Sequence, residues 1–183
     1  MSVYLISDTH FNDSEILGSS PRDFDNISDM NQTLLQNWNN TVSESDSVLF
    51  GGDLGHSDIS KQEFWNWLYK VNSTELVLRG NHDPYTRSEL DHTEFPISFK
   101  ETFEFSHDSF DFCYSHKFSG IPDDFEGWHI HGHVHHKQPF LEIDTKRINV
   151  SADVLGYHPI SLEELINAIE QGKDIDEYSP NSI

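Results

Sequence analysis

Five short fragments rich in metal-binding side chains follow one another in a fixed order, and they constrain the fold more than any other feature of the chain. Most of them stand where an apolar run gives way to polar residues. The fragments are Asp8-Thr9-His10, Gly51-Gly52-Asp53, Gly80-Asn81-His82-Asp83, Ser115-His116 and Gly132-His133-Val134-His135. In α/β proteins, ligands cluster outside the carboxyl ends of the strands. The order therefore predicts strands whose ends meet at one site.

Apolar runs of strand length precede three of these fragments. The runs lie at residues 3–7, 47–50 and 75–78. Further along, Phe and Tyr residues alternate on both sides of a polar turn at residues 107–109. Such alternation predicts a hairpin, whose second strand would end at His116.

Helical periodicity and capping signals predict three helices. Apolar residues recur at helical spacing through residues 28–41, as expected for an amphipathic helix. Residues 60–63 and 161–164 have the Ser-x-x-Glu pattern of a capping box. The helix that begins after Ser161 should stop at Gly172. Strands that alternate with helices indicate an α/β protein.

The length of 183 residues fits one domain with a sizeable core. Nothing in the middle of the chain has the composition of a linker. We expect a domain over residues 1–173 and a loosely held polar tail over residues 174–183. No apolar run is long enough to span a membrane, and the N-terminus lacks the basic segment of a signal peptide. These features predict a cytoplasmic protein.

The chain is strongly acidic, with 32 Asp and Glu against 11 Lys and Arg and a formal net charge of −21. One interpretation is an acidic mesophile protein. A halophilic surface is the favoured interpretation, because only seven of the residues are lysine. Such a surface should repel itself in low salt, whereas near 1 M salt the Debye length falls to about 3 Å and screens the repulsion.

The five fragments supply carboxylate, amide and imidazole groups, which are enough for two metals that share a carboxylate. Two metals about 3.5–4 Å apart favour in-line attack on phosphorus, because both the attacking and the leaving oxygen need charge stabilisation. The expected activity is therefore that of a metal-dependent phosphoesterase. Mixed Asp, His and Asn ligands suit Mn, Fe, Co, Ni or Zn, and we expect Mn(II) to support the strongest activity.

The fragments also resemble the calcineurin-like metallophosphoesterases, whose pattern is Asp-x-His, Gly-Asp, Gly-Asn-His-Asp/Glu, His and then Gly-His-x-His. The resemblance runs from about Val3 to Gly172, and it is closest to the small, single-domain bacterial, archaeal and phage members. Residues 8–11, the pair Arg22 and Phe24, and residues 148–153 carry the subgroup likeness. The family implies an α/β fold of two mixed β-sheets packed face to face with helices outside, a four-layer α-β-β-α sandwich.

The resemblance also implies a role for each ligand. Asp53 would be the carboxylate that bridges the two metals. The remaining ligands divide into one set for each metal, namely Asp8, His10 and His135 for the first, and Asn81, His116 and His133 for the second. The glycines at positions 52, 80 and 132 would let the backbone turn sharply before each ligand.

By the same resemblance, His82 would protonate the leaving oxygen or stabilise its developing charge, and Asp83 would orient His82. The attacking group would be a hydroxide that bridges the two metals.

Each ligand also has an ordinary interpretation. Asp8 alone could cap a helix, Asp53 and Asn81 could be turn residues, and His116 could be a core histidine. Their joint order favours the metal site. The segment 128–136 contains five histidines and could be a nonspecific metal trap.

The Gly-His-x-His match selects His133 and His135 from that segment. We expect His131 to lie in the core or behind the ligands, and His136 to lie on the surface.

Arg22, Asn12 and Lys117 are candidate phosphate contacts. His56 is a possible substrate contact, although an exposed loop residue is its competing interpretation. In small relatives a Pro often follows the His of the fourth fragment, whereas here Lys117-Phe118 follows it.

The expected reaction is hydrolysis of a phosphomonoester or phosphodiester. The motifs are too close together for an inserted cap domain, so the site should be open, which suits diesters, nucleotides or a flexible phosphorylated partner. A nuclease is the main alternative, although the acidic surface opposes nucleic-acid binding at modest salt. A scaffold that lost its chemistry, or a simple metal-binding protein, is less consistent with the intact ligands and His82.

Overall fold

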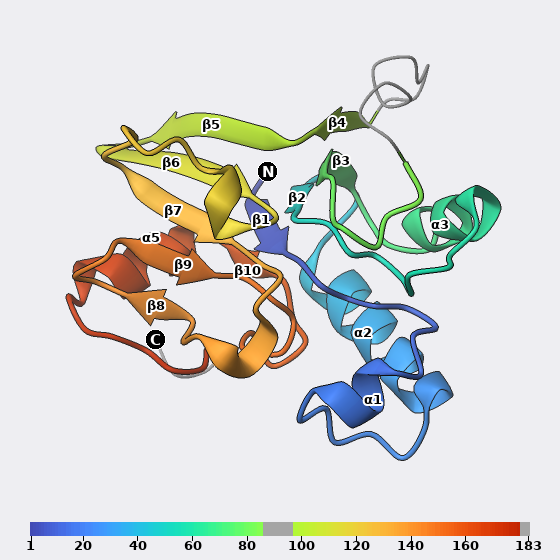
Figure 1. Cartoon of the computed structure of the whole chain (residues 1–183). Coiled ribbons are helices and arrows are strands. Elements are labelled where there is room, and N and C mark those ends of the chain that lie inside the picture. The colour runs from blue at the N-terminus through green and yellow to red at the C-terminus, as the bar shows by residue number, and fades with distance from the viewer. Residues whose placement is uncertain (86–96, 180–183) are drawn as a thin grey trace.

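The protein folds into two mixed β-sheets with helices outside, as Figure 1 shows. The computed structural model describes residues 1–85 and 97–179. Within these residues, each sheet has five strands, in the orders β10-β1-β2-β3-β4 and β5-β6-β7-β9-β8. Buried apolar side chains from both sheets form one continuous core. The predicted fold class is confirmed.

The first sheet contains the three strands expected from the apolar runs. Strands β1 to β4 are parallel, and β10 pairs antiparallel with β1. The bounds are Val3–Ile6 for β1, Ser47–Phe50 for β2, Thr74–Leu78 for β3, Ser98–Lys100 for β4 and Ile160–Ser161 for β10. Parallel strands place their carboxyl ends at one edge, so the residues that follow β1, β2 and β3 converge there.

The second sheet begins with the predicted hairpin of β5 and β6. Strands β6, β7 and β9 are parallel, and β8 pairs antiparallel with β9. The bounds are Thr102–His107 for β5, Phe110–Ser115 for β6, Trp128–His131 for β7, Leu141–Glu142 for β8 and Arg147–Asn149 for β9. The Tyr114 hydroxyl donates to the Ile6 carbonyl at 3.2 Å and joins the two sheets.

Helices and turns connect and cover the strands. The α-helices are α1 at Ile16–Ser19, α2 at Ile27–Thr41, α3 at Lys61–Leu68 and α5 at Leu162–Glu170. The 3-10 turns are η1 at Phe118–Gly120 and η2 at His135–Lys137. The helix predicted at residues 28–41 is α2, which begins one residue before the predicted start, at Ile27. Among the described residues, no helix is both long enough and apolar enough to cross a bilayer.

The two predicted capping boxes differ. In α5 the reciprocal box is complete between Ser161 and Glu164. In α3 the Ser60 side chain accepts from the backbone N–H of Glu63, but the Glu63 carboxylate accepts instead from Asn12 Nδ2 at 2.7 Å. This Glu therefore ties α3 to the loop that follows β1.

The tail was expected to be loosely held from Asp174 onward, and the structure corrects this expectation for residues 175–178. Ile175 exchanges two backbone hydrogen bonds with Leu141, of 2.9 and 3.0 Å. Tyr178 is buried, and its hydroxyl donates to Glu164 at 2.8 Å. These contacts attach the segment to both β8 and α5. Residues 180–183 lie outside the described residues.

Candidate metal centre

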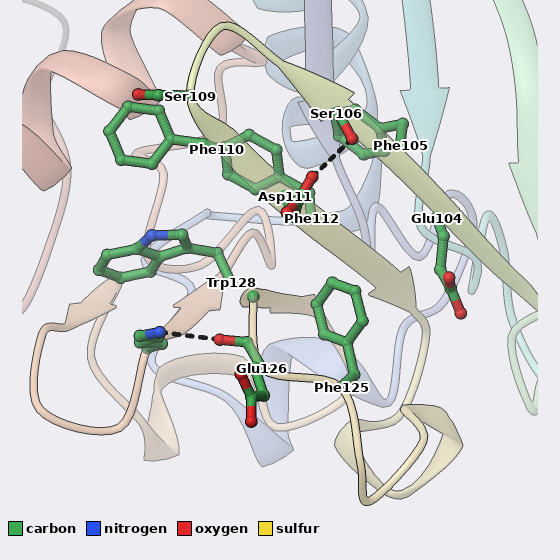
Figure 2. A pocket seen from close by; sticks show the side chains of 12 residues that line it. Glu104, Phe105, Ser106, Ser109, Phe110, Asp111, Phe112, Phe125, Glu126 and Trp128 are labelled. Atoms are coloured by element: carbon green, nitrogen blue, oxygen red, sulfur yellow. Dashed lines mark hydrogen bonds between the residues drawn. The ribbon is translucent and has the colours of Figure 1, made fainter.

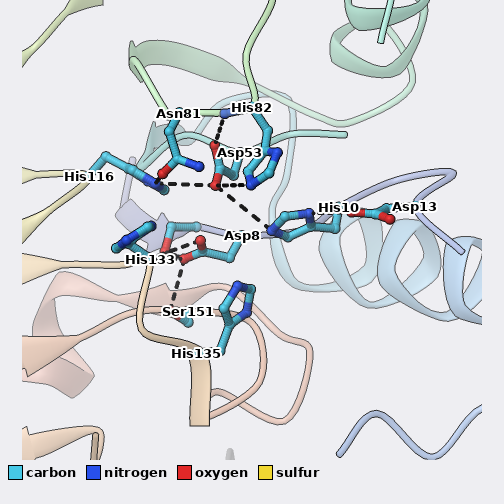
Figure 3. Close-up of polar contacts among 12 residues, drawn as sticks. Asp8, His10, Asp13, Asp53, Asn81, His82, His116, His133, His135 and Ser151 are labelled. Atoms are coloured by element: carbon cyan, nitrogen blue, oxygen red, sulfur yellow. Dashed lines mark hydrogen bonds and ion pairs between the residues drawn. The ribbon is translucent and has the colours of Figure 1, made fainter. Parts of the chain in front are cut away.

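The residues that follow the strand ends bring two groups of metal-ligand side chains together, as Figure 3 shows. One group contains Asp8, His10 and His135, and the other contains Asp53, His116 and His133. Within each group the ligand atoms lie within 4.8 Å of one another. These groups follow the partition that the family resemblance implied.

Asp53 lies between the two groups. Its Oδ2 atom is 3.2 Å from Nε2 of His116 and 3.9 Å from Nε2 of His10. Its Oδ1 atom accepts from the backbone N–H of His82 at 2.8 Å, which holds the carboxylate in place. Asp53 belongs to the second group, but its carboxylate therefore lies near a histidine of each group.

Asn81 belongs with the second group. Its Oδ1 atom lies 3.1 Å from Nε2 of His116. The amide is neutral, so it adds an oxygen ligand without adding negative charge.

Asp8 is completely buried at the end of β1. Its carboxylate accepts from the Ser7 hydroxyl at 2.5 Å, the Ser151 hydroxyl at 2.9 Å and the backbone N–H of His133 at 2.9 Å. The contact with His133 links β1 of the first sheet to the loop after β7 of the second. The carboxylate therefore helps to set the spacing between the two donor groups.

Three of the histidines are oriented by a second contact at Nδ1. His10 Nδ1 lies 2.9 Å from Asp13, His135 Nδ1 lies 2.8 Å from Asp153, and His116 Nδ1 lies 2.9 Å from the Gly51 carbonyl. Because carboxylates and carbonyls only accept hydrogen bonds, each Nδ1 carries the proton and each Nε2 faces the site. No sequence pattern gave a role to Asp13, and Asp153 was noted only as part of the segment 148–153 that carries the subgroup likeness.

The surroundings of the His10 Nε2 atom indicate whether these residues fit a metal ion. It is buried and has no hydrogen-bond partner among the residues that the structure describes. A buried polar nitrogen without a partner costs about 1–3 kcal/mol, and a bound ion is one of the explanations for such an atom. Nitrogen and oxygen donors gathered around it match the ligand preferences of divalent transition metals. The residues present therefore fit the metals that the family implies.

The backbone is strained at most of these ligands. Within the described residues, ten non-glycine residues have a positive φ, and five of them are Asp8, His10, Asp53, His133 and His135, with φ between 51° and 67°. Such conformations are uncommon for residues other than glycine and cluster at functional sites. The strain directs side chains from strand ends into a shared space.

The glycines next to the ligands act in two ways. Gly52 has a φ of 93°, so it permits the sharp turn that was predicted before Asp53. Gly80 and Gly132 instead provide room: a Cβ atom at Gly80 would collide with Asp53, and one at Gly132 would collide with Asp8.

The electrostatics of the second group centre on Asp53 and His116. Burial lowers the pKa of His116, but the hydrogen bond to Asp53 and the negative charges of Asp8 and Asp53 outweigh it and raise the pKa to about 9. Burial also works against the charge of Asp53, yet His116 holds its pKa well below the usual range. Without a metal, these two side chains form an ion pair.

The predicted role of Asp83 is wrong. Its carboxylate accepts from the backbone N–H groups of Gly80 at 2.7 Å, Leu54 at 3.0 Å and Asp53 at 3.1 Å. It therefore braces the two loops that carry Asp53 and Asn81 and does not orient the His82 ring. Burial is the main reason that its pKa rises to about 6.

Arg22 is not a phosphate contact, because its side chain is fully buried. The guanidinium donates to the carbonyls of Asp8 and Thr9 and to both carboxylate oxygens of Asp153. It thereby fastens the residue that orients His135 to the loop that carries Asp8. The contacts with Asp153 span 131 residues of sequence, so no local pattern could reveal them.

The other predicted substrate contacts are exposed or half-buried. The Asn12 side chain is exposed and is held by Asn31 and Glu63. His56 Nε2 lies 3.7 Å from Glu63, and Lys117 is exposed next to His116. Their contact with a substrate stays a prediction.

His82 and the remaining histidines of segment 128–136 also have distinct places. The His82 side chain is 35% exposed, and its Nε2 atom lies 4.0 Å from Asp53 Oδ2, so it is at the edge of the site. His131 is buried, as expected for a core position, and burial lowers its pKa. His136 is exposed.

A hollow of about 560 Å³ lies at the β5–β6 hairpin, away from this centre (Figure 2). Acidic side chains line it, including Glu104, Asp111 and Glu126. Its described lining residues include no histidine or cysteine. The hollow therefore offers carboxylates but, among its described lining residues, none of the imidazole donors of the metal centre.

The comparisons with known proteins agree with the fold and with the family resemblance of the sequence. A family model described as calcineurin-like phosphoesterase matches residues 1–176, so the chain belongs to this family. The uncharacterized protein MJ1445 from Methanocaldococcus jannaschii is 37% identical over 177 residues, which cover 93% of each chain. The crystal structure of AQ665, a protein of unknown function from Aquifex aeolicus, has a TM-score of 0.67 at 21% identity and covers 92% of this chain and 99% of that chain.

Proposed function

We propose that the protein hydrolyses phosphoesters, mono- or diesters, with two divalent metal ions held by the two donor groups. The position of Asp53 carries this proposal, because its Oδ2 atom lies within 4 Å of Nε2 atoms from both groups. A storage site for one metal needs no carboxylate between two sets of ligands.

The donor sets favour a site that attracts phosphate. Asp8, His10 and His135 would hold one ion, and Asn81, His116 and His133 the other, with Asp53 shared. When bound, the two ions would polarise the phosphoryl group and lower the pKa of the water that attacks phosphorus. Two carboxylates oppose roughly four positive charges, so the loaded site keeps a net positive charge.

The position of His82 supports a role at the leaving group. Its backbone N–H is held by Asp53 at 2.8 Å, and its partly exposed ring projects at the edge of the centre. From there it would donate a proton to the leaving oxygen, which is a general acid's role.

The proposed cofactor is manganese. Oxygen and nitrogen donors without thiolate suit Mn, Fe, Co and Ni, and they also accept Zn. The chain's single cysteine, Cys113, is buried and is not one of the proposed ligands.

The test is metal reconstitution of chelator-treated protein, followed by assays on a monoester, a linear diester, a cyclic nucleotide and a nucleic-acid strand. We expect two ions per chain and recovery of hydrolysis that is strongest with Mn(II). Hydrolysis that is unchanged after the metals are removed would contradict the proposal. Preference for the strand over every small ester would favour a nuclease.

A further inference from the structure

A cavity of about 240 Å³ opens from one side of the metal centre. His10, His82 and His135 line its inner end, whereas Asn81, His116 and His133 are not among its described lining residues. It therefore extends from the first donor group alone. The outer walls come from α1 and the residues before and after it, and from η2.

The two walls of this cavity are attached to the metal centre. The Ser20 hydroxyl donates to Asp153, the carboxylate that orients His135. The same hydroxyl lies 3.4 Å from Nδ1 of His136 in η2. A group bound in the cavity would thus have a defined position relative to His135.

His82 is one of the residues that line the cavity, and this indicates which part of a substrate the cavity would bind. In the proposed function His82 protonates the leaving oxygen, so the leaving group must lie on the His82 side of the phosphorus. The cavity is the hollow that His82 shares with the first donor group. We propose that it is a leaving-group subsite, an inference that rests on the proposed function.

The lining indicates the chemical class of this leaving group. Glu15 offers a carboxylate that can accept from hydroxyls, and Ser19 and Lys137 offer donors. Ile16 is the one apolar side chain among the described lining residues, so an extended aryl or lipid group finds little to pack against. Carboxylates bind the hydroxyls of a sugar in the same manner in nucleotide sites.

The size narrows the class further. Pockets for drug-sized ligands occupy roughly 300–1,000 Å³, so this cavity suits a smaller group. The subsite is therefore fitted to one polyol or sugar unit, such as glycerol or ribose.

The experiment uses the double variant Glu15→Ala/Lys137→Ala of the metal-loaded protein. It is matched by Glu163→Ala/Lys173→Ala, which removes the same charges at exposed positions outside the cavity lining. The kcat/KM values are measured on glycerol phosphate, ribose 5-phosphate and 4-nitrophenyl phosphate. We expect the first double variant to lose about tenfold or more on the polyol and sugar esters, because hydrogen bonds to charged groups are lost, and to change less than about twofold on the aryl ester. The control should change neither.

A second pair of variants tests the space itself. Ser19→Trp should fill the cavity and lower kcat/KM for all three esters, whereas Gly18→Trp, on the same short helix but facing open space, should not. Equal losses in both Trp variants, or equal losses on polyol and aryl esters in the Glu15/Lys137 variant, would overturn the subsite.

Binding of free ribose separates this inference from the proposed function. Saturation transfer from the protein to ribose should be visible with the parent chain and be lost in the Glu15/Lys137 double variant. If the parent chain hydrolyses no phosphoester at all, the proposed function fails. If it hydrolyses esters but ribose binds both chains equally or neither, the subsite alone is wrong.

Discussion

The two donor groups of the metal centre contain similar ligands but are supported differently. In the first group, His10 and His135 each contact a carboxylate through Nδ1, from Asp13 at 2.9 Å and Asp153 at 2.8 Å. In the second group, His116 contacts a backbone carbonyl, and the His133 ring packs against His116 at 5.2 Å. A carboxylate partner fixes the ring and also raises its basicity as a ligand.

Because of this difference, the two proposed metal ions should not be equivalent. The first group has charged partners behind its histidines, and Arg22 fastens one of those partners to the loop of Asp8. The second group uses a neutral amide, Asn81, and a neutral carbonyl. We therefore expect the first group to hold its ion more tightly, and the second to exchange its ion more readily.

The largest effect should come from removing the carboxylate that both groups share. Asp53→Asn should lose at least one ion and nearly all turnover, because one carboxylate serves both ions. Metal content by elemental analysis and kcat are the measurements. Asp144→Asn, at an exposed position, is the control for the amide change. Normal metal content in Asp53→Asn would show that another residue bridges the groups.

The next largest effect separates catalysis from metal binding. His82→Ala should keep both ions, because its ring is not in either donor group. Hydrolysis of alkyl or nucleoside esters should fall by about 10²–10⁴-fold. That of nitrophenyl esters should fall much less, because nitrophenolate is a stable anion that leaves without being protonated. Steady-state kinetics on both ester types give the comparison. Equal losses on both would mean that His82 positions the substrate and does not deliver a proton.

Replacing the carboxylates behind the first group should sharpen the difference between the groups. Asp13→Asn and Asp153→Asn should each weaken the tighter ion by about 10–100-fold and leave the weaker ion nearly unchanged. Calorimetric titration with Mn(II) resolves the two affinities, with Asp144→Asn again as the control. Weakening confined to the second ion would reverse our assignment. Asp13→Asn is the safer variant, because Asp153 also neutralises the buried Arg22.

The smallest effect is a pH dependence of the second group. Without a metal, the hydrogen bond to Asp53 and the charges of Asp8 and Asp53 raise the pKa of His116 to about 9, so the ring is protonated at pH 7. A metal binds only the neutral imidazole, so binding must release this proton. Affinity for the weaker ion should thus rise with pH, by about tenfold per unit, and level off near pH 9. Titrations in buffers of different ionisation enthalpy count the released protons; no release at pH 7 would contradict the ion pair.

The parts that could be predicted from the sequence share a local signal. Strands β1, β2 and β3 were recognisable as apolar runs, and each ends just before a ligand fragment. The donor groups follow the partition implied by the family pattern, because parallel strands bring their ends to one edge. Positive φ angles at Asp8 and Asp53 then aim the side chains inward.

The parts that could not be predicted depend on contacts between distant segments. Arg22 is attracted to a buried Asp153 that lies 131 residues away, so its position in the chain did not distinguish a substrate contact from a buried brace. Asp83 points back to three backbone N–H groups, an orientation that the motif does not specify. Among the residues whose role was not predicted, Asp13 could most easily have been found from the sequence, because it follows His10 by only three residues.

The central claim is that Asp53 joins two metal ions in one centre. The most direct measurement is an electron paramagnetic resonance spectrum of the chain loaded with two equivalents of Mn(II), with the metal content of the same sample determined by elemental analysis. We expect two ions per chain and the spectrum of a magnetically coupled pair, with the coupling lost in Asp53→Asn. One ion per chain, or two ions that give the spectrum of isolated Mn(II), would contradict the claim.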